Sequence, residues 1–308
     1  MEKDDAAPYR PGPHATEDNR WSGRLSLSIE TVSFPRDLSV MLLQVPGESP
    51  YDLRFRLFGF SIRVAWTFWL GAVVFGYALV DGIDMMLGMD SPGRMPLLLL
   101  WGVCLFVSIL IHELGHAFAF RLYGIESSVV LYHFGGLAVP RTSFGGSRGF
   151  APMNLGAGPD LLIAAAGPLA QLVSALLLVG LFMAFDYRIE AFRWMPGGLD
   201  RLWPAVLEGR PIENAGLFAL VTFYTFPSVL WALLNLVPVW PLDGGRIARS
   251  VVVLAGGPTE WSLWISLVTA AAMAVYGFQS GALFLGILFL SLAVSNFQLL
   301  QMRDGWRY

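Results

Sequence analysis

Long apolar runs constrain this chain more than any other feature of its sequence. A helix needs roughly 20 apolar residues to cross the hydrocarbon core of a bilayer, and four runs of this kind cover residues 58–80, 95–122, 161–185 and 216–240. A fifth apolar region, residues 261–300, is too long for one span. The Phe-Gln-Ser-Gly stretch at residues 278–281 divides it into two helices, because Gly and polar residues interrupt apolar segments. The sequence therefore predicts six membrane-spanning helices.

The composition agrees with a protein embedded in a lipid bilayer. Hydrophobic residues make up 55% of the 308 residues and charged residues only 14%, whereas soluble domains carry about 25% charged residues. The net charge of −3 excludes the basic surface that nucleic-acid binding requires. Because Cys104 is the one cysteine in the sequence, a disulfide framework and a cysteine-based metal site are excluded as well. Any metal site has to be built from histidines and carboxylates.

The distribution of arginine predicts an orientation in the membrane, since Lys and Arg near the ends of spans tend to remain cytoplasmic. If six helices alternate, the acidic turn at residues 81–90 and the mixed-charge segment at residues 186–213 fall on the outer side. The opposite side receives Arg54, Arg56, Arg63, Arg121, Arg141, Arg148, Arg246, Arg249, Arg303 and Arg307. We therefore expect cytoplasmic tails at residues 1–53 and 301–308, and a six-helix core at residues 54–300.

Two connections between the predicted spans have a composition of their own. The segment at residues 126–160 contains too many glycines for a helix, yet it opens with the Ser-Val-Val-Leu-Tyr run at residues 128–132, which favours a strand or hairpin. The segment at residues 186–213 suits either an interfacial segment or an ordinary loop. The expected fold is thus an all-α integral membrane protein with about six transmembrane helices and a small membrane-associated β segment after the second helix.

The second apolar run contains a known metal-binding pattern. Residues 112–116 read His-Glu-Leu-Gly-His, which matches the H-E-x-x-H pattern of zinc peptidases. At about 100° per residue, His112 and His116 lie one turn apart on one helix face, so both imidazoles can reach one ion. Glu113 projects roughly 60° away from His116, close enough to touch a metal-bound water without ligating the metal. This is the position of a general base.

A chance match to this pattern is the alternative interpretation. Burying two histidines and a glutamate in an apolar span costs several kcal/mol if they lack partners, and ionisable groups at membrane depth are functional by default. Polar contacts between helices could account for one of the histidines but hardly for all three residues. The setting therefore favours a functional site.

A catalytic zinc site usually takes three protein ligands and leaves one position open. Asp243 is the one acid between Glu213 and Glu260, and it lies within the Pro-Val-Trp-Pro-Leu-Asp-Gly-Gly stretch at residues 238–245. The prolines unwind a helix and the glycines allow a sharp turn, so the carboxylate would be presented from irregular backbone that lines a cavity. A helix-ending turn is the alternative interpretation of this stretch. His133, on the predicted strand, is a competing ligand that we rank below Asp243.

Taken together, residues 112–116 on one predicted span and residues 235–245 on a later one resemble the site-2 protease family of intramembrane zinc metalloproteases. The resemblance covers most of the chain, from about residue 57 to residue 293. With no inserted stretch of soluble composition, the chain resembles the compact members that lack an accessory regulatory domain.

This resemblance implies a zinc-dependent endopeptidase with one Zn²⁺ per chain. Its metal ligands would be His112, His116 and Asp243, and Glu113 would activate water for peptide hydrolysis. Its substrates would be single-pass membrane proteins of a bacterial cell membrane, such as anti-sigma factors or other membrane-tethered regulators, cut within the bilayer. Such regulated intramembrane proteolysis usually follows a first cut by another protease.

The resemblance also implies substrate-binding residues. Gly135 and Gly136 look like part of the family's membrane-associated β segment, whose edge would pair with an extended substrate. Asn235 matches an asparagine that the family places upstream of the metal-binding aspartate, where its amide would hold the substrate or polarise its carbonyl. Gln171 ends a motif that usually ends in Asn, and we carry over its polar role. Close helix packing through small residues is the alternative explanation for Gly167 in the same motif.

Two functions from other classes compete with proteolysis. A membrane metal transporter or metal sensor would use the same ligands, but transport predicts ionisable residues along several spans, and the third and the last two predicted spans contain almost none. An inactive relative that binds membrane clients without cutting them is the other alternative. The presence of both histidines, Glu113 and Asp243 argues against it.

Overall fold

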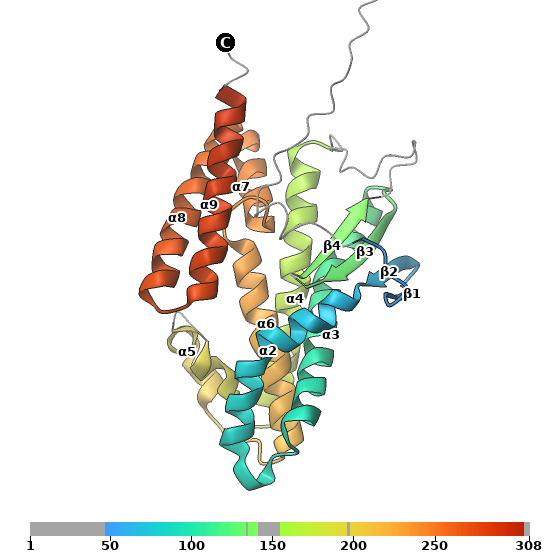
Figure 1. Cartoon of the computed structure of the whole chain (residues 1–308), viewed down its shortest axis with the longest axis vertical. Coiled ribbons are helices and arrows are strands. Elements are labelled where there is room, and N and C mark those ends of the chain that lie inside the picture. The colour runs from blue at the N-terminus through green and yellow to red at the C-terminus, as the bar shows by residue number, and fades with distance from the viewer. Residues whose placement is uncertain (1–46, 134, 141–154, 196–197, 305–308) are drawn as a thin grey trace, which may run out of the picture. The chain divides into compact units, whose positions relative to one another are not determined.

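The computed structural model describes residues 47–133, 135–140, 155–195 and 198–304. Most of the predicted N-terminal tail, residues 1–46, lies outside the described residues, as do residues 305–308 of the predicted C-terminal tail. Figure 1 shows the arrangement of the described helices and strands.

Six of the described helices are long and apolar enough to cross a membrane. In chain order they are α2 (Trp66–Leu87), α3 (Arg94–Leu122), α4 (Ala157–Ala184), α6 (Ala215–Leu236), α8 (Glu260–Gln279) and α9 (Leu283–Asp304). A short 3-10 turn, η1 (Gly88–Asp90), follows α2. These helices and a small sheet confirm the predicted fold class.

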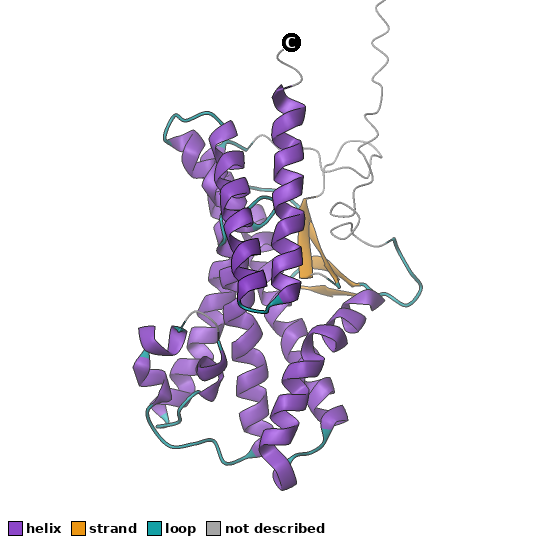
Figure 2. Cartoon of the chain, turned by 60° about the vertical axis from the view of Figure 1, so that its left-hand side comes forward, coloured by secondary structure: helices purple, strands orange, loops and turns teal. Residues whose placement is uncertain are grey.

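The strands form one four-stranded sheet in the order β1-β2-β3-β4, drawn in orange in Figure 2. The strands are β1 (Leu53–Leu57), β2 (Phe60–Val64), β3 (Ser127–Tyr132) and β4 (Gly135–Pro140). Antiparallel pairing forms one hairpin before α2 and a second after α3, and parallel pairing of β2 with β3 joins them. The strand or hairpin expected after the second span is confirmed, whereas the first hairpin was not predicted.

The first predicted span began too early, because residues 58–64 belong to the β1–β2 hairpin and α2 begins only at Trp66. Phe58 and Gly59 have φ angles of 50° and 86°, which fit the tight two-residue turn that joins twisted antiparallel strands. Burial then alternates along β2 with a period of two residues. The sequence prediction assigned this half-buried strand to the start of the helix, since a short apolar run is typical of strands and of buried helix segments alike.

Helix α3 occupies the centre of the bundle. It packs against α2, α4 and α6, and against β3 and β4. Its approach to α4 is close, because a Cβ on Gly115 would lie 2.4 Å from the carbonyl oxygen of Ala166. Glycine at this position brings α4 next to the turn of α3 that carries the two histidines.

The segment between α4 and α6 is folded. It contains η2 (Glu190–Trp194), α5 (Leu199–Leu202) and η3 (Pro204–Leu207). Ile189, Phe192 and Val206 are buried in a cluster that also includes Val221 of α6. These residues therefore pack against α6, and their predicted position at the membrane interface stays a prediction.

The fourth predicted span was too long, because α6 ends at Leu236 and not at residue 240. Val237 precedes a proline and is extended, as residues before proline usually are. A further helix, α7 (Asp243–Leu254), follows where the sequence predicted only a turn. Helix α7 packs on α4 and α8, and it is not one of the six candidate spans.

The division of the last apolar region is confirmed, since α8 ends at Gln279 and α9 begins at Leu283. The two helices pack along each other and lie side by side in Figures 1 and 2. Both also hold the backbone that leads into α7. The N–H of Trp240 donates to Oγ of Ser266 at 3.1 Å, and its carbonyl accepts from Nδ2 of Asn296 at 2.8 Å.

Candidate metal centre

Helix α3 brings three ionisable side chains to one buried place. His112, Glu113 and His116 are 2%, 4% and 5% exposed. The Nε2 atoms of the two imidazoles lie 3.2 Å apart. This proximity follows from helix geometry, because residues i and i+4 stack on the same face.

Asp243, in the first turn of α7, brings a carboxylate to the same place. Its Oδ2 atom lies 3.1 Å from Nε2 of His112 and 3.2 Å from Nε2 of His116. The backbone has to turn tightly to deliver it, since a Cβ on Gly244 would lie 2.3 Å from the carbonyl oxygens of Leu236 and Val237. The glycine after Asp243 is therefore a steric requirement of this turn.

The three ligand atoms fit a zinc ion. They form a nearly equilateral triangle with sides of 3.1 to 3.2 Å, and tetrahedral zinc with ligand bonds of about 2.0–2.1 Å would hold such atoms roughly 3.3–3.4 Å apart. Two imidazoles and a carboxylate are also a known donor set of catalytic zinc. Among the described residues, His112, His116 and Asp243 form the one group identified as able to hold a metal ion.

Each imidazole also has a hydrogen-bond partner at its Nδ1 atom. Nδ1 of His116 lies 2.7 Å from the carbonyl oxygen of Ile163, and Nδ1 of His112 lies 2.9 Å from Oε1 of Gln171. A ring that donates from Nδ1 keeps its lone pair on Nε2. Both Nε2 lone pairs are then available to a metal ion.

Replacing Gly167 by Ala is expected to weaken zinc binding at least tenfold. A Cβ on Gly167 would lie 2.2 Å from Nε2 of His116, so the ring would have to leave its place, and disturbing the orientation of a ligand typically costs about 10–100-fold in metal affinity. The affinity is measured by competition with a chromogenic chelator. Gly180→Ala is the matched control in the same helix, because its Cβ would meet nothing within 4 Å. Equal zinc affinities of the two variants would contradict this role for Gly167.

Strand β4 lies against Glu113. A Cβ on Gly136 would be 2.3 Å from Cγ and 2.6 Å from Oε1 of Glu113, and a Cβ on Gly135 would be 2.5 Å from the indole of Trp231 on α6. Glycine at both positions therefore lets the strand fit between α3 and α6. Because β4 is one of the two outer strands of the described sheet, an outer strand borders the candidate site.

An ion pair ties α7 to α4. The guanidinium of Arg246, one turn after Asp243, lies 2.6 Å from Oδ1 of Asp160, and Oγ of Ser250 donates to the other oxygen of that carboxylate at 3.3 Å. The contact holds the helix that carries the third ligand.

Two groups outside the spanning helices have shifted pKa values. Burial alone would raise the pKa of the Asp243 carboxyl, but the neighbouring imidazoles of His116 and His112 outweigh burial and hold this pKa below its ordinary value. The Asp243 carboxyl is therefore anionic near neutral pH, as a metal ligand has to be. Burial, and next to it the charge of Glu113, raises the pKa of Tyr132 to about 12, so its phenol stays neutral near neutral pH.

His133 does not belong to the cluster formed by His112, His116 and Asp243. Nδ2 of Asn235 donates to the carbonyl oxygen of Trp231 in its own helix at 2.9 Å. His133 follows β3, and its backbone packs on α2, because a Cβ on Gly71 would lie 2.7 Å from the carbonyl oxygen of His133. The geometry thus favours Asp243 over His133 as the third ligand.

Three contributions to the centre were missed by sequence reasoning: Ser108 and Ser228, which contact each other behind Gln171, and the carbonyl of Ile163. Ser108 lies four residues before His112, so the helical spacing could have placed it on the same face. The carbonyl gives no sequence signal, because every residue has one.

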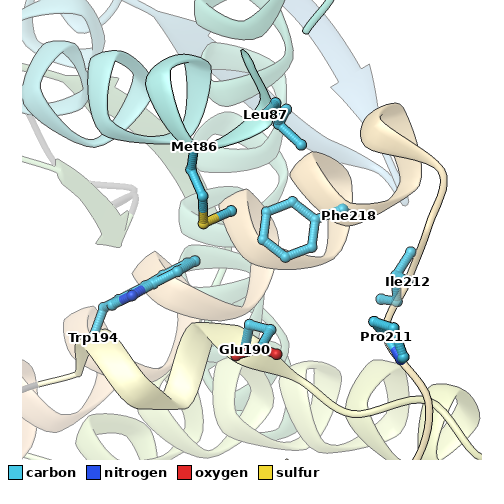
Figure 3. A pocket seen from close by; sticks show the side chains of 7 residues that line it. All are labelled: Met86, Leu87, Glu190, Trp194, Pro211, Ile212 and Phe218. Carbon is cyan, nitrogen blue, oxygen red and sulfur yellow. The ribbon is translucent and has the colours of Figure 1, made fainter. Parts of the chain in front are cut away.

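A separate cavity of about 280 Å³ lies away from these residues. Figure 3 shows the side chains that line it: Met86, Leu87, Glu190, Trp194, Pro211, Ile212 and Phe218. The Glu190 carboxylate forms ion pairs with Arg188 and Arg193, and none of the candidate site residues lines the cavity. We therefore assign it no part in metal binding.

Known proteins are similar to the part of this chain that contains the candidate site. The sequence profile of Peptidase family M50 matches residues 101–275, which is more than half of the chain and includes the three candidate ligands and Glu113. Zinc metalloprotease MJ0392 of Methanocaldococcus jannaschii is 26% identical over 211 residues, which is 66% of this chain and 46% of that protein.

Two further similarities involve a second sequence and a solved structure. The Synechocystis sp. protein sll0528, whose name marks it as a candidate zinc metalloprotease, is 30% identical over 202 residues, 64% of this chain and 42% of that protein. The chain thus spans less than half the length of both relatives. A solved structure of a site-2 protease from Methanocaldococcus jannaschii matches with a TM-score of 0.44 and 24% identity, covering 80% of this chain and 94% of the other.

Proposed function

This chain belongs to Peptidase family M50, the site-2 protease family of intramembrane zinc metalloproteases, and we propose that it is an endopeptidase that uses one zinc ion to cut membrane-spanning substrates. One observation carries the proposal: His112, His116 and Asp243 bring their ligand atoms within 3.2 Å of one another. Glu113 adjoins them on a helix long enough to cross the bilayer.

The position of the cluster along α3 supports cleavage inside the bilayer. The helix has 29 residues, which corresponds to about 43 Å, longer than the roughly 30 Å hydrocarbon core. His112 lies ten residues before the end of α3 at Leu122, or about 15 Å along the axis. His112 and His116 therefore both lie within the residues of a candidate membrane span.

The residues of the site divide the chemistry between them. His112, His116 and Asp243 would hold the zinc ion, which would supply a Lewis acid for activating water and polarising the scissile carbonyl. Glu113 takes one proton from the attacking water and later gives it to the leaving amine, so one water is consumed, one peptide bond is broken and the carboxylate is restored. Burial of Glu113 and its contact with β4 keep it fixed beside the ligands.

We assign the substrate backbone to the edge of β4. Peptide bonds within a helix are shielded, so a spanning segment has to unwind before it is cut, and an extended segment can add to a strand edge through main-chain hydrogen bonds. Gly135 and Gly136 supply this edge, and the amide of Asn235 is proposed to hold a substrate carbonyl. Single-pass membrane proteins, with tethered regulators such as anti-sigma factors as the first class to test, are the proposed substrates by analogy.

The proposed location is a bacterial cell membrane with both chain ends in the cytoplasm. The arginines of the β1–β2 hairpin would then face the cytoplasm, and Asp81 and Asp84 the outside. Arg94 lies on the acidic side, but its charge is paired with these two aspartates at 2.7 and 3.3 Å. A C-terminal tag should be cleaved by added protease in inside-out vesicles, and cleavage only in right-side-out vesicles would reverse the orientation.

Purified protein in vesicles with tagged single-pass substrates tests the proposed function. Fragments are expected to form, to stop forming when phenanthroline removes the metal, and to form again when Zn²⁺ is restored. Cleavage that is insensitive to the chelator would contradict the zinc mechanism. Zinc flux into the vesicles without cleavage would favour a transporter, and bound zinc without cleavage of several unrelated substrates would favour an inactive relative.

A further inference from the structure

Three polar side chains, one from each of three neighbouring helices, form a hydrogen-bonded row beside the candidate metal centre. Gln171 of α4, Ser108 of α3 and Ser228 of α6 are all 0% exposed. Oε1 of Gln171 lies 2.9 Å from Nδ1 of His112, and its Nε2 donates to Oγ of Ser108 at 2.8 Å. Oγ of Ser228 lies 2.8 Å from Oγ of Ser108. The row thus ends on an imidazole of the metal cluster.

The two imidazoles are backed by acceptors of different kinds. The partner of His116 Nδ1 is the carbonyl oxygen of Ile163, which can only accept a hydrogen bond. Nδ1 of His116 therefore carries the proton, and Nε2 keeps its lone pair. Behind His112 stands a carboxamide, which can accept through its oxygen or donate through its nitrogen. If the nitrogen faced His112, the ring would carry its proton on Nε2 and could not ligate a metal there. The observed orientation places the oxygen on this side and gives the amide N–H to Ser108.

We infer that Gln171 is a positioning residue of the metal centre, which holds His112 in the orientation and tautomer that present Nε2 to the ion. Ser108 supports it by accepting from the amide N–H, and Ser228 in turn donates to Ser108. The inference rests on the proposed function and deepens it. This role differs from the substrate-binding role that the sequence suggested for Gln171, and it fits a side chain that is 0% exposed and has a partner at each end of its amide.

Two replacements of similar size separate positioning from packing. Gln171→Glu keeps an oxygen that accepts from His112 and, when neutral, an O–H that can donate to Ser108. Gln171→Met fills a similar volume but offers no acceptor of comparable strength. Both variants are purified in detergent, loaded with zinc and titrated with a competing chelator. We expect Gln171→Met to bind zinc about 10–100-fold more weakly and Gln171→Glu to stay within about threefold of the wild type, since carboxylates commonly orient zinc-bound histidines.

A purely packing role predicts the opposite order, because an apolar interior accepts methionine more readily than a carboxyl group. Wild-type zinc affinity in Gln171→Met, or weaker binding in Gln171→Glu than in Gln171→Met, would therefore overturn the inference. Replacing zinc by Co²⁺ adds a spectroscopic readout, since the visible absorption of Co²⁺ reports its coordination geometry. An unchanged spectrum in Gln171→Met would also overturn it.

Ser108→Ala is a second variant that keeps the test decisive if changes at Gln171 disturb folding. This small change removes the hydroxyl that accepts from the amide N–H of Gln171. We expect the zinc affinity to fall several-fold, while the melting temperature of the metal-free protein stays close to that of the wild type. Unchanged affinity would contradict the supporting role of Ser108. A wild-type protein that binds no zinc would defeat the proposed function itself, whereas zinc-binding wild type with unaffected Gln171→Met defeats only this inference.

Discussion

Glu113→Gln is expected to abolish peptide cleavage while zinc remains bound. Glutamine has almost the size and shape of glutamate, so the contact with Gly136 is kept, but an amide cannot take a proton from water. Because the cluster of ligands consists of His112, His116 and Asp243, the exchange leaves every ligand in place. Loss of a general base costs about 10²–10⁴-fold in rate. Fragment formation and zinc per chain are measured on the same preparation.

The matched control is Glu208→Gln, which makes the same chemical change at an exposed carboxylate outside the cluster. It should cleave at the wild-type rate. Cleavage by Glu113→Gln at more than a small fraction of that rate would remove the assignment of Glu113 as the base. Loss of zinc from Glu113→Gln would instead make Glu113 a ligand, which the geometry does not support.

The part of the site that lies within one helix could be predicted from the sequence. The turn of α3 fixes His112, Glu113 and His116 relative to each other regardless of what packs around it. The cost of burying such groups in an apolar run then separated a functional site from a chance match. Six spans could be predicted for the same reason, because length and hydropathy are properties of each segment alone.

The contacts between helices could not be predicted in this way. Asp243 was placed beside the histidines by its isolation among apolar residues and by a family resemblance, and no local rule gives the 3.1 Å that the structure shows. Helix α7 was missed because a segment of 12 residues with two arginines has the composition of a loop between spans. Its contact with α4, the ion pair between Arg246 and Asp160, is visible only in the structure. The substrate role expected for Gln171 came from a motif, whereas its burial against Ser108 depends on how α3 and α4 meet.

The pairing of the strands could not be predicted from the sequence either. Strand β2 pairs in parallel with β3, although α2 and α3 both lie between them in the sequence. A short apolar run before a spanning segment is ambiguous between strand and helix until its partner is known. Here the partner begins only at Ser127, after two complete spans, and it supplies the framework that carries β4 to Glu113.

Removing the carboxylate of Asp243 is expected to weaken zinc binding at least about 100-fold, because loss of a residue that merely orients a ligand already costs about 10–100-fold and Asp243 is proposed as a ligand itself. Two neutral imidazoles would remain, without the negative charge that offsets the charge of the ion. Asp243→Asn is made beside Asp243→Ala, since asparagine keeps the shape of the first turn of α7 and separates the loss of the carboxylate from the loss of packing. Zinc per chain and chelator competition are measured, with the melting temperature of each metal-free variant.

His133→Ala is the decisive companion to these two variants, because His133 is the other ligand that the sequence allowed. It lies outside the cluster of ligand atoms, so zinc should remain bound when it is removed. If Asp243→Ala kept full zinc occupancy and His133→Ala lost it, the third ligand would come from the turn after β3 rather than from α7. The tight turn at Gly244 would then have no bearing on metal binding, and the position of the general base relative to the ion would have to be assigned again.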